Sequence, residues 1–191
     1  MLRGKNVALR PVEPRDVELL TSWWNDPAFI EGAAGRWPTR SQEVAKRVAK
    51  KPNYDKLGEF LIVSADTLGT DRETPLGHIA FSAPLRLPTC DCREIGFGIN
   101  PDHRRRGYAT QAARLLIDRL FSAQQVHRIQ AHCRVENVAS QRVLEGAGMT
   151  REGTLRGFAY LAGRYLDVDL YSILRPEWGD RQSYADRFGG L

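Results

Sequence analysis

The segment EIGFGINPDHRRRGYATQAARLLIDRLF, from Glu94 to Phe121, contains the strongest secondary-structure signals of the chain. It begins with a segment of strand character, 94–99, that ends in the turn-forming Asn100-Pro101-Asp102. It ends with an amphipathic segment in which apolar residues recur at helical spacing. These residues are Ala109, Ala112, Ala113, Leu116, Ile117 and Leu120, and together they make one helical face. The stretch therefore predicts a strand, a loop and a helix in immediate succession.

A basic loop, Arg104-Arg105-Arg106-Gly107-Tyr108-Ala109, joins the predicted strand to the predicted helix. The first turn of a helix has backbone N–H groups without partners, and the helix dipole adds positive charge there. Such a position binds phosphate, and the small residues at 107 and 109 let a pyrophosphate approach the backbone closely. The alternative is a solvated arginine cluster, but three arginines set against the positive end of a helix dipole favour a bound anion.

The loop differs from two common nucleotide-binding loops. It lacks the Gly-Lys-Ser/Thr ending of an NTPase phosphate loop. It also lacks the three glycines of the dinucleotide fingerprint that follows the first strand of a Rossmann fold. The sequence therefore indicates a phosphate-bearing ligand of another kind.

The composition is that of an ordinary globular protein. The chain has 191 residues, 42% hydrophobic and 27% charged, which predicts one domain with a real core. We place this domain at 1–175 and a flexible C-terminal tail at 176–191, because the tail is polar and glycine-containing. No apolar run approaches the roughly 20 residues that span a bilayer, and there is no signal-peptide core. We therefore expect a cytoplasmic protein without membrane contact.

Charge and cysteine content narrow the choice of partners. The net charge of +5 allows an anionic partner, which fits nucleic acid and equally a cofactor with three phosphate groups. Cys90 and Cys92 have no second Cys or His pair at zinc spacing, so we expect no metal site.

The pattern along the chain predicts a mixed α/β (α+β) fold and not a repeating parallel βαβ array. Loops are expected at 28–40 and 84–93. Strands are expected at 6–12, 59–65, 76–81, 94–99, 128–133, about 150–160 and 164–174, and helices after Asp16, Ser41, Gly107 and Asn137.

Two motifs resemble those of the GCN5-related N-acetyltransferase (GNAT) superfamily. Arg104-x-x-Gly107-x-Ala109 resembles its acetyl-CoA motif, and Asn137-x-x-Ser140 with Gly148-Met149 resembles a second conserved segment. Leu9-Arg10-Pro11, Trp24-Asn25-Asp26-Pro27 and the last strand, 166–174, are similar to the RimJ/RimL-like branch. The resemblance implies a GNAT fold, with a central sheet of about seven strands flanked by about four helices. It also implies that the sheet splays between the strands near 94–99 and 128–133.

The resemblance implies a site for acetyl-CoA that is made largely of backbone. Phe97 and Ile99 would bind the pantetheine arm, with Gly96 and Gly98 allowing a bulge that splays the sheet. Asn137 and Ser140 would lie against the same arm. The phosphates would lie on Arg104, Arg105, Arg106, Gly107, Tyr108, Ala109 and Thr110.

Acyl transfer from a thioester to an amine needs a group that takes a proton from the amine and a group that protonates the departing thiolate. We expect Glu94 to be the proton acceptor; the alternative is a solvated carboxylate at the end of a strand. Many superfamily members use a tyrosine to protonate the thiolate, but this chain has Leu144 at that position. The resemblance to the RimJ/RimL-like branch implies that a serine can serve instead, which makes Ser140 the candidate acid; the alternative is a hydroxyl that satisfies the first helical turn.

The amine acceptor is expected between the aromatic N-terminal region and the splayed strands. Candidate acceptor-binding residues are Trp24, Phe29 and Trp37, together with Glu94 and His132. The alternative for the aromatic residues is packing in the core, and the alternative for His132 is a structural histidine.

The predicted function is transfer of an acetyl group from acetyl-CoA to a primary amine. The acceptor is a protein N-terminus, an amino-acid derivative or an amine-bearing metabolite or antibiotic, and the protein is a monomer or homodimer. One alternative is a protein that kept the CoA site and lost transfer, which Leu144 motivates. Another is a nucleic-acid-binding module, which the basic loop motivates, although no recognition motif accompanies that loop.

Overall fold

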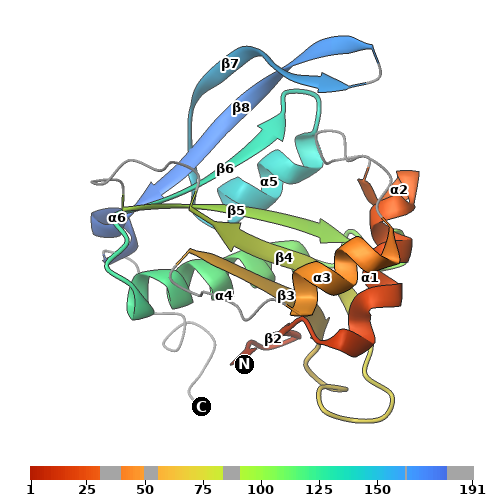
Figure 1. Cartoon of the computed structure of the whole chain (residues 1–191). Coiled ribbons are helices and arrows are strands. Elements are labelled where there is room, and N and C mark those ends of the chain that lie inside the picture. Colours follow the sequence, from red (N-terminus) through yellow and green to blue (C-terminus); the bar gives the residue numbers. More distant parts are fainter. Residues whose placement is uncertain (31–39, 50–55, 84–90, 162, 180–191) are drawn as a thin grey trace.

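A computed structural model describes the chain except for residues 31–39, 50–55, 84–90, 162 and 180–191. The fold is a single open sheet with helices on both faces (Figure 1). Trp37 and the first cysteine, Cys90, therefore lie outside the described residues.

The sheet has eight strands in the order β1-β2-β3-β4-β5-β6-β8-β7, against about seven expected. The additional strand is the two-residue β1 at the sheet edge. Every pair of neighbours is antiparallel except β5 and β6, which are parallel. The strands are β1 (Leu2–Arg3), β2 (Val7–Pro11), β3 (Leu57–Ser64), β4 (Pro75–Ser82), β5 (Cys92–Ile99), β6 (Arg128–Arg134), β7 (Thr150–Leu161) and β8 (Arg164–Leu174).

Four longer helices match the four expected, and two short helices add to them. The prediction of an unbroken loop at 28–40 was wrong at its start, because Pro27–Ile30 forms the short helix α2. Proline suits the first turn of a helix, since its missing N–H would have no partner there. The helices are α1 (Val17–Asn25), α2 (Pro27–Ile30), α3 (Ser41–Ala49), α4 (Tyr108–Ala123), α5 (Val138–Gly146) and α6 (Arg175–Gly179), with 3-10 turns η1 (Pro14–Asp16) and η2 (Pro101–His103).

The two faces of the sheet bury separate cores. One core joins α4 and α5 to alternate strand residues such as Ile95, Ile129 and Tyr171. The other joins α1 and α3 to alternate residues of β2 and β3, such as Leu61. The predicted apolar face of α4 is confirmed, since Ala112, Ala113, Leu116, Ile117 and Leu120 are all buried. Strand periodicity thus assigns each strand side chain to the α4 face or to the α1–α3 face.

The predicted splay of the sheet is present. β5 pairs with β6 only over Cys92–Glu94 and Arg128–Gln130, and the strands then separate although both continue. The expected bulge at Gly96 and Gly98 is absent, because β4 and β5 pair without a register shift from Glu94 to Ile99. Both strands remain regular as they diverge, and beyond Glu94 and Gln130 their facing edges have no strand partner.

The first residues beyond the predicted domain are ordered, whereas composition predicted a flexible tail. In α6, Trp178 stacks on Phe121 at 5.3 Å and its indole N–H donates to Asp118 at 2.7 Å. Arg175 donates to backbone carbonyls at the end of α4, including that of Phe121 at 2.9 Å. Arginine thus satisfies carbonyls that a helix end leaves unpaired. Within the described ranges, no helix is both long and apolar enough to cross a membrane.

Candidate active site

The gap between β5 and β6 exposes backbone groups of β5. The Asn100 N–H donates to Leu76 of β4 at 2.9 Å, while the Asp91 carbonyl accepts from His127, which precedes β6. Backbone polar groups alternate in direction along a strand, so even-numbered residues of β5 face β4 and odd-numbered residues face β6. Phe97 and Ile99 therefore turn their N–H and C=O groups toward the gap, where the sequence placed the pantetheine arm.

The loop that follows β5 has the geometry of an anion site. Arg105 and Gly107 both have positive φ, 61° and 75°, and such turns point successive N–H groups to one side. In the described part of the chain, the backbone N–H groups of Arg105, Arg106 and Gly107 donate to no backbone carbonyl, and those of 108–110 lie in the first turn of α4, where N–H groups lack intrahelical acceptors. The side chains of Arg105 and Arg106 are exposed beside them. The residues present therefore fit a pyrophosphate.

Arg104 has a different place from the one expected. Its N–H donates to Pro101, and its guanidinium donates to the carbonyls of Ile99 at 3.2 Å and of Ala28 in α2. Two of its donors bind backbone carbonyls, so Arg104 shapes the loop and joins it to α2. Contacts of Arg104, Arg105 and Arg106 with phosphate stay a prediction.

Helix α5 starts directly after β6 and brings Ser140 to the widening end of the gap. The Asn137 side chain accepts from the Ser140 N–H at 3.0 Å, which is the N-cap interaction of this helix. The cap is thus supplied by Asn137, and the Ser140 hydroxyl is not needed for it. Leu144 is buried in the core, as its apolar side chain requires.

Glu94 and His132 meet at the point where β5 and β6 separate. Both lie on the α1–α3 face. Ala131 and Cys133, which flank His132 in β6, are buried on the α4 face, so His132 points to the opposite face, as Gln130 does. Glu94 is paired with Gln130 and shares that face. The His132 Nδ1 lies 3.2 Å from Glu94 Oε2. Hydrogen bonds from His132, and to a smaller extent from Gln130, hold the pKa of the Glu94 carboxyl below its usual value although burial opposes the shift. Glu94 is therefore an ionised carboxylate with a histidine partner.

A chain of polar side chains holds this pair in place. Gln130 donates from Nε2 to Glu94 at 3.1 Å and accepts at Oε1 from Arg128 Nε at 3.2 Å. Arg128 in turn binds both carboxylate oxygens of Glu152, at 2.6 and 2.7 Å. Gln130 and Arg128 were not predicted as site residues, although their alternation with buried Ile129 and Ala131 shows that they share the face of His132.

Phe158 covers His132 from the long β7–β8 hairpin, which extends beyond the other strands (Figure 1). The two rings stack with centroids 5.4 Å apart and an interplanar angle of 13°. Phe158 is nevertheless 60% exposed. No sequence signal pointed to it, because its position depends on the register shift between Leu155 and Ala159 in β7.

Trp24 and Phe29, the two expected aromatic acceptor residues that the structure describes, are both buried. Trp24 is 3% exposed and packs edge-on against His78, so it is part of the core and we do not assign it to the acceptor. Phe29 stacks on Trp23 and covers Gly98, where a Cβ would come within 2.9 Å of the ring. Phe29 therefore lies beside the gap, and its role in binding stays a prediction.

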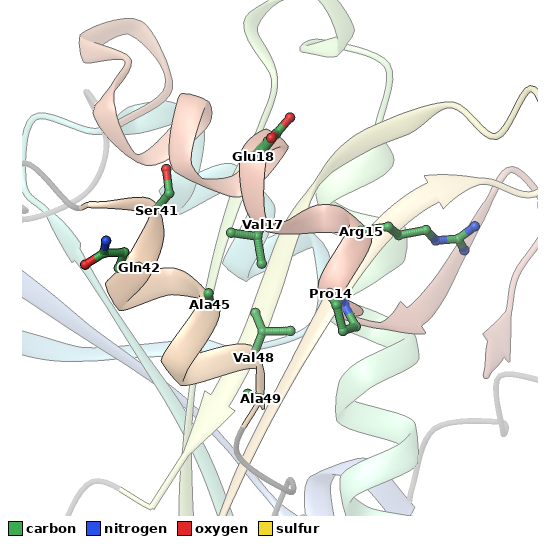
Figure 2. A pocket seen from close by; sticks show the side chains of 9 residues that line it. All are labelled: Pro14, Arg15, Val17, Glu18, Ser41, Gln42, Ala45, Val48 and Ala49. Atoms are coloured by element: carbon green, nitrogen blue, oxygen red, sulfur yellow. The ribbon is translucent and has the colours of Figure 1, made fainter.

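A pocket of about 580 Å³ lies apart from this gap, between η1, α1 and α3 (Figure 2). Its floor is apolar, with Val17, Ala45 and Val48, and Arg15 and Glu18 lie at its rim. None of its lining residues comes from β5, β6 or the loop before α4. The pocket brings together no catalytic groups, so we place the chemistry at the gap.

Known proteins share this arrangement. The family model described as acetyltransferase (GNAT) domain matches residues 6–150. The chain is 36% identical to the probable N-acetyltransferase YjcK of Bacillus subtilis over 93% of this chain and 98% of that protein. It is 33% identical to the ribosomal-protein-serine acetyltransferase of Escherichia coli over 78% of this chain and 75% of that protein.

A solved structure agrees with these relatives. Mycobacterium smegmatis RimJ in complex with CoA-disulfide superposes with a TM-score of 0.77 at 25% identity, covering 95% of this chain and 87% of that one. The likeness extends to a structure that contains CoA, and the loop before α4 has the donors that its phosphates need. The chain therefore belongs to the GNAT acetyltransferases, in the RimJ/RimL-like branch, and is an N-acetyltransferase that uses acetyl-CoA.

Proposed function

We propose that this protein transfers the acetyl group directly from acetyl-CoA to a primary amine while both substrates are bound. The gap between β5 and β6 is the main support for direct transfer. Backbone groups of Phe97 face into it, the loop before α4 lies at its wide end, and Glu94 with His132 lies where it begins. Because both substrates are held at one gap, the amine can attack the thioester directly, and no covalent intermediate on the protein is required.

Acetyl-CoA would extend along the gap. Its pyrophosphate would accept from the N–H groups of 105–110, with Arg105 and Arg106 adding positive charge. The pantetheine arm would pair with the backbone edge of β5 at Phe97 and at the Ile99 N–H, as an added strand does, while the Ile99 carbonyl accepts from Arg104. Asn137 and Ser140 would contact the arm from the opposite side, because α5 begins where β6 ends.

Proton transfer would involve groups at both ends of the reacting centre. The amine nitrogen must lose a proton as the new amide bond forms, and the Glu94–His132 pair is positioned to receive it. The sulfur leaves as a thiolate and must gain a proton, which Ser140 would supply. The hydroxyl is available for this role because Asn137 caps the helix.

For the acceptor we propose a protein or peptide N-terminus. The relative from Escherichia coli is named for acetylating a serine of a ribosomal protein. In this chain the acceptor side is bordered by Phe29 and the exposed Phe158, and the Glu94 carboxylate attracts a cationic amine. The entrance is open and lies beside a carboxylate. It therefore suits the cationic N-terminus of a polypeptide better than a small molecule that needs an enclosed pocket.

The experiment is acetyl-CoA turnover with a panel of amines. Peptides with a free N-terminal Ser or Ala are compared with the same peptides blocked at the N-terminus, and with a polyamine and an aminoglycoside. We expect release of free CoA thiol and an added acetyl mass with the unblocked peptides alone. Tight CoA binding by calorimetry without turnover of any amine would instead support a ligand sensor.

A further inference from the structure

The arrangement around His132 assigns roles within the proton-accepting pair, and this inference rests on the proposed acetyl transfer. The imidazole is half-buried at the start of the gap, with a side-chain exposure of 20% against 34% for Glu94. Its Nδ1 is the nitrogen that faces the carboxylate, at 3.2 Å. A carboxylate only accepts hydrogen bonds, so this contact requires a proton on Nδ1.

We propose that His132 is the catalytic residue that takes the proton from the amine, and that Glu94 is a positioning residue that fixes its tautomer. With the proton on Nδ1, the lone pair lies on Nε2, on the far side of the ring from Glu94. A carboxylate behind an imidazole also stabilises the imidazolium that forms when Nε2 is protonated. This revises the expectation that Glu94 itself removes the proton.

The surroundings of Glu94 suit a support better than a base. Its Oε2 accepts from both His132 and Gln130, so two donors already stabilise the charged carboxylate. The attacking amine gives up a proton as the new amide bond forms, so the group that receives this proton must bind it readily. A carboxylate stabilised in its charged form by two hydrogen bonds binds a proton less readily than a free one.

Two contacts fix the imidazole in orientation. Gln130 links Glu94 to Arg128, which is held by Glu152, so the carboxylate cannot rotate away without breaking several hydrogen bonds. Phe158 stacks on the ring at an interplanar angle of 13° and sets its plane. A base whose tautomer and plane are both fixed loses little entropy when the substrate arrives.

The step balances as follows. The amine nitrogen forms a bond to the thioester carbon and gives one proton to His132 Nε2. The carbon–sulfur bond breaks, the electron pair leaves with sulfur, and the thiolate gains one proton from the Ser140 hydroxyl. The products are an N-acetyl amide and CoA with a free thiol. His132 then gives its proton to solvent and Ser140 regains one from solvent, so a neutral amine releases no net proton.

The test compares His132→Ala, His132→Gln, Glu94→Gln and Glu94→Ala, with His127→Ala as the matched control because His127 is exposed and uses only its backbone groups. We expect both His132 variants to lose about 10²–10⁴-fold in kcat with unchanged CoA affinity by calorimetry. Imidazole added to His132→Ala should restore part of the activity. His127→Ala should behave as wild type.

The Glu94 variants separate positioning from catalysis. Glu94→Gln keeps an oxygen that accepts from Nδ1, so it should retain more activity than Glu94→Ala and more than either His132 variant. A His132→Gln enzyme that folds and keeps kcat within about threefold of wild type would overturn the proposal. Equal losses in Glu94→Gln and His132→Ala, with no rescue by imidazole, would also overturn it and return the role to Glu94. Failure of the proposed function is distinct, since then the wild type itself acetylates no amine.

Discussion

Among the described residues, two histidine–glutamate pairs lie on one face of the sheet, and they differ in burial and in access. His132 and Glu94 lie at the open gap, whereas His78 and Glu59 lie between the paired strands β3 and β4. His78 packs against Trp24 and is buried at 5% exposure. Glu59 also binds Arg47 of α3. Burial raises the pKa of the Glu59 carboxyl, but His78 and Arg47 outweigh burial and the net shift is downward.

The comparison shows that residue type alone does not make a site. Both pairs carry an imidazole and a carboxylate, but helices and neighbouring strands surround the His78 pair on every side. Only the separation of β5 from β6 gives the His132 pair access to a substrate. We therefore expect changes in the open region to affect activity and changes in the closed region to affect stability.

The largest effect is expected in the open region from Gly107→Val. A β-branched residue at a φ of 75° is strained, and its side chain enters the anion site. We expect a loss of CoA affinity of about 100-fold or more, since charge-assisted hydrogen bonds contribute about 1–3 kcal/mol each. Calorimetry with CoA measures it. Gly69→Val is the matched control, because Gly69 has a φ of 78° in an exposed turn between β3 and β4 and has open space around it. Equal loss of affinity in both variants would mean that strain and not the ligand site is responsible.

Ser140→Ala is expected to have the next largest effect, again on activity. If the hydroxyl protonates the thiolate, kcat should fall by about 10², the lower part of the range for general acids, because water can substitute. KM should change little, since the interaction exists only in the transition state. Steady-state kinetics check this, with Ser122→Ala as control because Ser122 is an exposed serine of α4. The defect should shrink with a thioester whose thiol is more acidic.

The melting temperature of the same variant gives an independent readout. Because Asn137 caps α5, Ser140→Ala should leave stability nearly unchanged, whereas Asn137→Ala should cost about 1 kcal/mol. A Ser140→Ala protein that melts earlier and retains full kcat would show that the hydroxyl is structural.

In the closed region, Glu59→Ala should reduce stability and spare catalysis. It removes the carboxylate that binds Arg47 and lies 3.8 Å from buried His78, and the loss of a hydrogen bond to a charged group costs about 1–3 kcal/mol. Chemical denaturation measures the change, and acetyl transfer measured on the folded protein should match wild type. A large fall in kcat without loss of stability would break the distinction between the two pairs.

The smallest effect concerns acid stability at the edge of the open region. Hydrogen bonds from Arg128 and Ser172 lower the pKa of Glu152 to about 2. A group with a lowered folded pKa stabilises the protein above its unfolded pKa of about 4.3, and this contribution is lost as the pH falls toward 2. The side chain is 38% exposed, so we expect less than about 1 kcal/mol. Denaturation at pH 6 and pH 3 should show a smaller difference in Glu152→Gln than in wild type.

Much of the fold follows from local patterns in the sequence. The sequence predicted the apolar face of α4, the cap at Asn137 and the strands around 94–99 and 128–133. These features were predictable because helix and strand periods and capping preferences act over a few residues. The predictions failed where residues far apart in the sequence make contact. Polar composition predicted a flexible tail at 176–191, but Trp178 stacks on Phe121, and the first residues of this segment form α6.

The family and the cofactor could be predicted from the sequence, since glycine, arginine and strand–loop–helix order express local backbone requirements. The surroundings of single residues could not be predicted: Arg104 donates to backbone carbonyls, Trp24 is buried and Phe158 covers His132 through contacts made in the folded chain. The tertiary structure also decided which of two identical residue pairs can meet a substrate. The physical reason is that access and hydrogen-bond partners depend on strand register and sheet closure, which join residues far apart in the chain.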